Sequence, residues 1–327
     1  MGWYQAVGRP AFLALPPEAA HRIANAMLGL PLAWRHMGGV PEDPSLATTV
    51  AGISLRTPIG LAAGFDKRCA HLDALGRLGF GYVVGGTITR APRRGNPKPR
   101  IVRYPQRRSM VNAMGLPNPG AEAAARNLAR IPRTAPRFVS IADESVADAT
   151  AAAELLAPHA DALELNAGCP NVAWGRDRDN EAHLADLLDS LSARTPLPVF
   201  VKLPPFAGGI EREVVLALAG IAAEHGAAGI TCANTRPHEE PRLAVGLGGL
   251  SGRDLSASTP GMVADVRAAT GLPIHASGGV ATARDVRACL DAGAVTVQVY
   301  TALVYEGPRV IGDLCTGLST DRLPSRA

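Results

Sequence analysis

The stretch Asn166-Ala167-Gly168-Cys169-Pro170-Asn171 gathers side chains that can perform chemistry. It follows directly on the apolar run 162–165, which is typical of a buried strand. A thiol such as Cys169 can act as a nucleophile or as a base when its pKa is set suitably. The flanking amides Asn166 and Asn171 each offer a hydrogen-bond donor and an acceptor. We therefore expect this stretch to be the chemical centre of a polar cavity.

Other apolar runs also end in small, amide, hydroxyl or lysine side chains. Glycines let the backbone approach a flat ring or a phosphate closely. Lys202 lies in a core run and needs a partner when buried, which an anionic cofactor would supply. The residues that follow or end these runs are Ala63, Gly64, Lys67, Thr87, Lys202, Asn234, Thr235, Gly278, Gly279, Tyr300 and Thr301.

The elements that must position these groups alternate along the chain. Eight short apolar runs are separated by alanine-rich stretches of helical character, and this alternation predicts a closed (β/α)₈ barrel of the TIM type. The alternative is an open doubly wound sheet, but no G-x-G-x-x-G motif opens a helix after the first strand. The predicted strands are 59–63, 81–85, 138–141, 162–165, 199–203, 229–232, 273–276 and 296–299. The predicted helices are 69–78, 121–130, 147–156, 181–193, 211–225, 259–270 and 283–292.

In such a barrel the reacting groups lie at the carboxyl ends of the strands, where these polar residues stand. Gly278-Gly279 after the seventh strand and Tyr300-Thr301 opening the last helix form the usual phosphate site of the fold. The four amides of Asn112, Asn166, Asn171 and Asn234 suit a ring rich in carbonyl and N–H groups.

Two regions stand outside the alternation. Residues 1–50 precede the barrel, residues 51–327, and we expect a helix starting at Pro17 with Ala20, Ile23, Ala24, Met27 and Leu28 on one apolar face. An excursion rich in proline and arginine, residues 90–120, follows the second strand, and a loop of this length is usually functional. We expect its arginines to form a solvated face.

The composition is consistent with a large enzyme core. Of the 327 residues 47% are hydrophobic and only 4% aromatic, which suits parallel strands covered by helices. The net charge of +4 does not indicate a nucleic-acid partner. The five cysteines show no metal-ligand spacing, and no metal is expected. We interpret Cys69, Cys232, Cys289 and Cys315 as small core residues.

Several motifs resemble the dihydroorotate dehydrogenases over nearly the whole chain. They include Gly60-Leu-Ala-Ala-Gly64-Phe-Asp-Lys67, Gly86-Thr-Ile-Thr89, Gly95-Asn-Pro-Lys-Pro-Arg100, Asn112-Ala-Met-Gly-Leu116, Ala233-Asn-Thr235 and Gly248-Gly-Leu-Ser-Gly252. The resemblance implies an FMN-dependent barrel that oxidises (S)-dihydroorotate to orotate in pyrimidine biosynthesis.

The resemblance also implies roles for individual residues. Cys169 is expected to remove a proton from the substrate while a hydride passes to the flavin, and Lys67 is expected to act beside it. FMN is expected to contact Ala63, Gly64, Lys67, Thr87, Asn166, Lys202, Gly252, Gly279, Tyr300 and Thr301. The substrate is expected to contact Lys67, Asn112, Met114, Gly115, Leu116, Asn171, Asn234 and Thr235.

The N-terminal residues Trp3-Tyr4, Phe12 and Pro17-Glu-Ala-Ala-His21 resemble the quinone-dependent class. That resemblance implies a quinone as electron acceptor and a helical pair that contacts the membrane peripherally. We expect a cytoplasmic protein at the inner face of the cell membrane.

The active-site motif departs from the quinone-dependent pattern. Cys169 stands where that class carries serine, as in the soluble classes, and Ser140 and Asp143 replace an asparagine-rich stretch. Three alternatives follow: a fumarate-linked dihydroorotate dehydrogenase, a flavin enzyme acting on a related cyclic amide or enone, and a catalytically silent barrel that binds FMN or phosphate.

Overall fold

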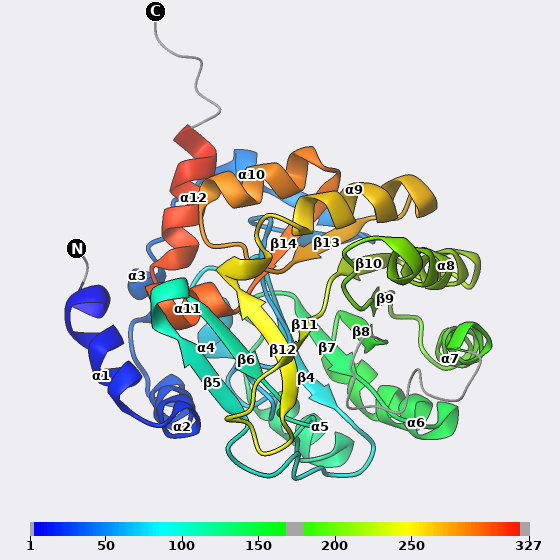
Figure 1. Cartoon of the computed structure of the whole chain (residues 1–327), viewed down its shortest axis with the longest axis horizontal. Helices are drawn as coiled ribbons and strands as arrows, with labels where there is room; N and C mark the ends of the chain where they lie inside the picture. Colours follow the sequence, from blue (N-terminus) through cyan, green and yellow to red (C-terminus); the bar gives the residue numbers. More distant parts are fainter. Residues whose placement is uncertain (1–2, 168–179, 321–327) are drawn as a thin grey trace, which may run out of the picture.

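Eight parallel strands close into a barrel in which β14 pairs back to β3 (Figure 1). The structure is a computed structural model that describes residues 3–167 and 180–320. All eight predicted strands are present, so the prediction of a TIM barrel is confirmed and the open sheet is excluded. The barrel strands are β3 (Ile59–Leu61), β4 (Tyr82–Ile88), β7 (Arg137–Ile141), β8 (Ala162–Asn166), β9 (Val199–Lys202), β10 (Gly229–Cys232), β13 (Ile274–Ser277) and β14 (Ala294–Val299).

Helices between the strands form the outer layer, close to their predicted positions. The largest difference is at α4, which begins three residues later than the sequence predicts because Asp66 accepts the backbone N–H groups of Arg68 and His71 in a preceding turn. The outer helices are α4 (Leu72–Arg77), α5 (Ala121–Arg130), α6 (Val146–Leu156), α7 (Asn180–Arg194), α8 (Gly209–Glu224), α9 (Thr259–Thr270), α10 (Ala283–Asp291), α11 (Thr301–Glu306) and α12 (Val310–Thr320). Short helical turns are η2 (Pro44–Leu46), η3 (Pro105–Arg107), η4 (Ala157–His159) and η5 (Arg253–Leu255).

Aromatic side chains fill the amino-terminal half of the barrel. The rings of Phe138 and Phe200 stack at 5.3 Å between centroids, and Tyr82 lies 4.7 Å from Phe138. A Cβ at Gly60 would lie 2.3 Å from the Tyr82 ring, so glycine is needed at that point of β3. A hairpin of β1 (Thr48–Val50) and β2 (Ile53–Leu55) packs Val50 and Leu55 against these rings. The open space of the barrel therefore lies at its carboxyl end.

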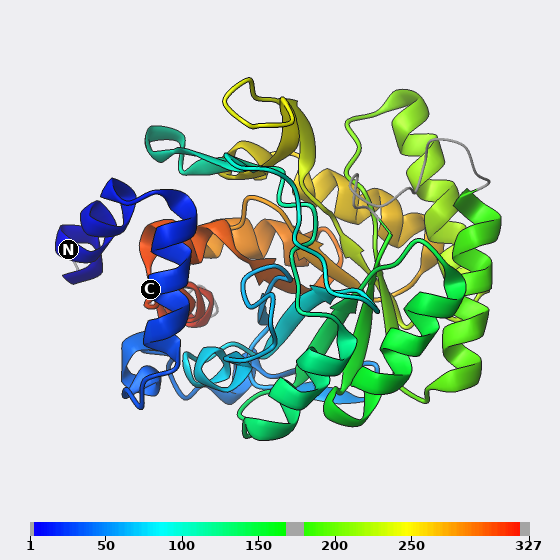
Figure 2. The same cartoon turned by 90° about the horizontal axis from the view of Figure 1, so that it is seen from below.

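A second, four-stranded antiparallel sheet lies over that end, and we call it the roof sheet (Figures 1 and 2). Its strands follow the carboxyl ends of β4 and β10, in the order β11-β12-β6-β5. The excursion at 90–120 thus contributes a hairpin to the roof sheet, and its partner strands at 236–252 were not predicted. The strands are β5 (Ile101–Tyr104), β6 (Ser109–Asn112), β11 (Arg236–Glu239) and β12 (Leu247–Gly252).

The N-terminal extension packs beside the roof sheet, as the blue helices of Figure 2 show. Its helices are η1 (Tyr4–Gly8), α1 (Arg9–Ala14), α2 (Pro17–Leu28) and α3 (Trp34–Gly38). The Tyr4 hydroxyl donates to the Val304 carbonyl of α11 at 2.7 Å. The predicted helix at Pro17 is confirmed, but its apolar face is only partly covered: Ala20 and Leu28 are buried, whereas Ile23 is 44% exposed.

The expectation of a solvated arginine face in the excursion is wrong for two residues. Arg100 is buried and makes paired hydrogen bonds of 3.0 and 3.1 Å with Glu18 of α2. Arg103 donates to the carbonyls of Phe12 and Leu13 at the end of α1. A buried guanidinium requires such partners, and here the extension provides them.

Two leucine-sized side chains of α8 differ in exposure and test the packing of the outer layer. Leu218 is 4% exposed and Ile210 is 79% exposed. We expect Leu218→Ala to lower the free energy of unfolding by about 2–5 kcal/mol, because it removes buried methyl groups and leaves a cavity. Ile210→Ala is the matched control and should change it by less than about 0.5 kcal/mol. Urea unfolding measures both, and equal losses would contradict this packing.

Candidate functional site

A cavity of about 990 Å³ lies between the barrel rim, the roof sheet and the N-terminal extension. Every predicted site residue that the structure describes lines this one cavity, from the strand ends and from the roof sheet. Cys169 and Asn171 lie outside the described residues. The predicted residues that line the cavity are Ala63, Gly64, Lys67, Thr87, Asn112, Met114, Gly115, Leu116, Asn166, Lys202, Asn234, Thr235, Gly252, Gly279, Tyr300 and Thr301.

A chain of hydrogen bonds joins four strand ends at the rim. The Asn234 amide donates to the Asn166 carbonyl oxygen at 3.0 Å, and the Asn166 amide donates to the Thr87 hydroxyl at 3.1 Å. The Thr87 hydroxyl lies 3.0 Å from the Ser140 hydroxyl. Ser140 thus ends this chain of hydrogen bonds. Each amide uses one N–H in this chain of hydrogen bonds and carries a second donor besides.

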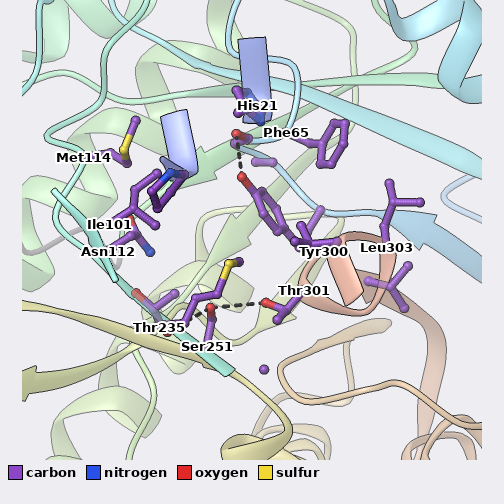
Figure 3. A pocket seen from close by; sticks show the side chains of 18 of the residues that line it. His21, Phe65, Ile101, Asn112, Met114, Thr235, Ser251, Tyr300, Thr301 and Leu303 are labelled. Atoms are coloured by element: carbon purple, nitrogen blue, oxygen red, sulfur yellow. Dashed lines mark hydrogen bonds between the residues drawn. The ribbon is translucent and has the colours of Figure 1, made fainter. Parts of the chain in front are cut away.

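Two glycines of the predicted site lie in left-handed backbone and pack tightly against other loops. Gly279 has φ +76°, and a Cβ there would lie 2.2 Å from the Ser256 backbone nitrogen. Gly252 has φ +93°, and its Cβ would lie 2.9 Å from a methyl carbon of Thr301. The Thr301 hydroxyl donates to Ser251 at 3.2 Å (Figure 3). The turn after β13, the end of β12 and the start of α11 therefore meet at one corner of the cavity, where backbone can approach a ligand closely.

Lys202 of β9 places an ammonium in the wall of the cavity. Its side chain is 8% exposed, and its ammonium lies 3.8 Å from the Glu164 carboxylate. That separation is longer than a hydrogen bond. Gln298 lines the cavity beside it and its side-chain oxygen makes no hydrogen bond with any described residue. Buried polar atoms of this kind are ordinarily hydrogen-bonded, so this wall suits a polar ligand that accepts from Lys202 and donates to Gln298.

Lys67 offers a second amine from the loop after β3. Its ammonium donates to the Gly64 carbonyl. Burial lowers the pKa of Lys67 to about 8, although the Asp66 carboxylate beside it acts to raise the pKa. Lys67 is thus a cation at neutral pH that gives up its proton under mildly alkaline conditions. A carboxylate ligand would be a suitable partner for it.

The roof sheet supplies the groups that face the barrel from the other side. The Asn112 amide at the end of β6 donates to the Gly249 carbonyl at 3.4 Å. A Cβ at Gly249 would lie 1.9 Å from the Thr235 hydroxyl oxygen, so glycine in β12 makes room for Thr235. Asn112 and Thr235 lie near each other at the cavity wall in Figure 3.

The extension closes the cavity on a third side with aromatic and apolar groups. His21 of α2 lies 5.6 Å from Phe65, which lies 5.5 Å from Tyr300 (Figure 3). Burial, aided by the charge of Lys67, lowers the pKa of His21 to about 3, so the ring is neutral at physiological pH. Apolar residues of the extension that line the same space are Trp3, Phe12, Leu13, Ala20, Ala24, Met27 and Leu28.

Sequence reasoning missed several residues of the cavity. Gln298 could have been found because it precedes Tyr300 by two positions and so shares the inward face of β14. Glu164, which does not line the cavity but bonds the Gln298 amide beneath it, precedes Asn166 in the same way. Ser251 and Gly249 gave no such signal, since the segment Gly248-Gly249-Leu250-Ser251-Gly252 has little strand propensity. The four cysteines interpreted as core residues are all buried.

Comparisons with known proteins agree over most of the chain. The family model "Dihydroorotate dehydrogenase" matches residues 45–321. The chain is 39% identical over 328 residues to "Dihydroorotate dehydrogenase (quinone)" of Erythrobacter litoralis, covering 95% of this chain and 93% of that protein. It is also 39% identical to the protein of the same name from Leifsonia xyli, covering 94% and 95%. The crystal structure of Eimeria tenella DHODH in complex with ferulenol superposes with a TM-score of 0.79 at 28% identity, covering 93% of this chain and 91% of that one.

Proposed function

The chain belongs to the dihydroorotate dehydrogenase family, and we propose that it oxidises (S)-dihydroorotate to orotate with FMN as cofactor and a quinone as electron acceptor. The observation that carries the proposal is a single cavity with a polar side and an apolar side. Two lysines, three asparagines and the corner formed by the ends of β12 and β13 and the start of α11 face apolar residues of the extension. The family is flavin-dependent. The named relatives are quinone enzymes, which supports quinone over fumarate.

The residues of the cavity fit FMN at both ends. The corner of Gly252, Gly279 and Thr301 suits a phosphate, because close backbone and a helix start favour an anion. Lys202 and the unpartnered oxygen of Gln298 suit a ring with both acceptors and N–H groups. FMN would be held by Ala63, Gly64, Lys67, Thr87, Asn166, Lys202, Gly252, Gly279, Tyr300 and Thr301, and when bound it would accept a hydride.

The substrate would lie against the roof sheet. Lys67 would hold its carboxylate as an ion pair, while the amides of Asn112, Asn171 and Asn234 and the hydroxyl of Thr235 would bond its ring carbonyl and N–H groups. Met114, Gly115 and Leu116 would enclose it. These contacts fix the ring, and Cys169 would then remove the proton next to the ring carbonyl as a general base.

The quinone would enter between α1 and α2. The apolar lining of the extension continues into the cavity past His21 and Phe65. His21 is neutral, so it adds no charge to an apolar passage. Hydrogen bonds to the Asn25 side chain and the Phe65 backbone hold its ring in place. The Glu18–Arg100 pair fixes α2 on the roof sheet and so keeps this passage in place.

The outer surface of the extension would lie on the membrane. Of the nine exposed large hydrophobic side chains in the described part of the chain, five belong to residues 3–32. They are Trp3, Val7, Ile23, Leu30 and Leu32. No helix of the described residues is long and apolar enough to cross a bilayer. A peripheral position at the inner face of the cytoplasmic membrane, from which a lipid-dissolved quinone can reach the passage, is consistent with this surface.

The reaction can be tested with the purified yellow protein. We expect dihydroorotate to bleach its flavin absorbance under anaerobic conditions, and steady-state turnover to be faster with quinone than with fumarate. Cys169→Ala should lower turnover by roughly 10²–10⁴-fold, because it removes the base. Cys289→Ala on α10 is the control and should leave turnover unchanged. Absence of bleaching would rule out dihydroorotate, and faster turnover with fumarate would rule out quinone.

The role of Lys67 predicts a pH dependence of orotate binding. Binding needs the protonated amine, so affinity should be constant below the Lys67 pKa of about 8 and fall above it. At pH 9 it should be about tenfold weaker than at pH 7. Titration of the flavin spectrum with orotate measures this. Arginine stays protonated throughout this range, so Lys67→Arg should bind without that dependence; an unchanged alkaline loss in this variant would assign the effect to another group.

Membrane contact can be tested by sedimentation with vesicles containing anionic phospholipid. Trp3→Ser/Val7→Ser removes side chains that are 54% and 67% exposed, and we expect binding to weaken by about tenfold or more, since each buried apolar side chain contributes about 1.5–3 kcal/mol. The matched control is Ile210→Ser/Val214→Ser, at exposed apolar positions of α8. Equal binding by both variants would contradict contact through the extension.

A further inference from the structure

A buried carboxylate lies inside the barrel next to the cavity, and the proposed chemistry does not use it. Glu164 of β8 is 1% exposed. Side chains of a strand alternate between its two faces, so Glu164 shares the inward face of β8 with Asn166, while Leu163 and Leu165 belong to the outer core. The register pairs Lys202 with both Asn166 and Thr231, which brings Lys202 into the same interior layer.

The two oxygens of this carboxylate have different partners. Oε2 accepts from the Thr231 hydroxyl at 2.9 Å and from the Gln298 amide at 3.0 Å. Oε1 makes no hydrogen bond with any described residue and lies 3.8 Å from the Lys202 ammonium. Two neutral donors on β10 and β14 therefore orient the carboxylate so that its remaining oxygen faces the lysine.

This arrangement changes the charge that Lys202 presents to the cavity. A lone ammonium in this interior would be costly and would act as a full positive charge on any neighbouring ligand. With Glu164 beside it the pair is neutral as a whole, and attraction to the carboxylate fixes where the ammonium lies. Since both side chains are at least nine-tenths buried, solvent screens the pair little.

We propose that Glu164 is a positioning residue for Lys202 and that, through Lys202, it lowers the reduction potential of the bound flavin. This inference rests on the proposed function, because it needs a flavin in the cavity. Lys202 alone would favour the more negatively charged reduced form of the cofactor. The Glu164 carboxylate offsets part of that field and keeps the cofactor able to pass electrons on to the acceptor.

The test is the midpoint potential of the flavin in the Glu164→Gln holoenzyme. The substitution keeps the shape of the side chain and removes its charge, leaving Lys202 uncompensated. We expect the ratio of reduced to oxidised flavin at a fixed electrode potential to rise roughly tenfold, about 30 mV upward for a two-electron couple. Glu154→Gln makes the same chemical change at a surface pair whose acid is 44% exposed, and the potential should not change. An unchanged or lowered potential in Glu164→Gln would overturn the proposal.

A second variant tests the proposal if Glu164→Gln does not fold. Glu164→Gln/Lys202→Met removes both charges, and replacing a whole buried pair is tolerated far better than removing one partner. If the single variant fails to fold and thermal melting of the double variant resembles that of wild type, the pairing is supported. Failure of both would contradict it, because Glu164 would then support the barrel through other contacts.

A failure of the proposed function gives a different result. Wild-type protein that holds no flavin overturns FMN binding before any variant is compared. Wild-type protein that holds flavin but is not bleached by dihydroorotate overturns the reaction alone, and the potential measurement still tests Glu164.

Discussion

The site depends on a division of the barrel interior into an amino-terminal half filled by side chains and an open carboxyl-terminal half. A parallel barrel of eight strands encloses only enough space for layers of inward side chains. Here the amino-terminal layer is taken by Tyr82, Phe138 and Phe200, packed over Gly60 and sealed below by the β1–β2 hairpin. With that half filled, the polar residues at the carboxyl ends have one common space to face. Sixteen residues scattered from 63 to 301 thereby line one cavity.

The periodic parts of the molecule could be predicted from the sequence, because strand and helix patterns are local. Continuous apolar runs identified the barrel strands, from β3 to β14. Because reacting groups of such barrels follow the carboxyl ends of the strands, the sequence also identified Lys67, Asn166 and Thr301 as site residues. The roof sheet could not be predicted in the same way. β12 reads Leu247-Gly248-Gly249-Leu250-Ser251-Gly252, which has the composition of a turn, and its pairing with β6 depends on a contact between distant segments.

The partners of several charged side chains could not be predicted either, because these partners are distant in the sequence. Arg100 and Arg103 lie in a segment that resembles a solvated loop, and their partners are Glu18 and the end of α1, more than 80 residues earlier. Likewise, Lys202 was expected to need an anionic cofactor, but Glu164 already provides an acid inside the barrel. Sequence patterns give the face on which a charge lies, whereas its partner is decided by tertiary packing. The roles of Cys169 and Asn171 stay predictions from family resemblance.

The roof sheet also has a consequence for the order in which the protein is made. Strands β5 and β6 leave the ribosome early, but β6 pairs with β12, whose register places Asn112 opposite Gly249. Since chains are synthesised from the amino terminus and distant pairings form last, the cavity is roofed only after β10 to β12 have been translated. Until then the edge of β6 is an unpaired strand edge, a surface that other chains can join. The β5–β6 hairpin is therefore the segment of the nascent chain that most needs protection by a chaperone.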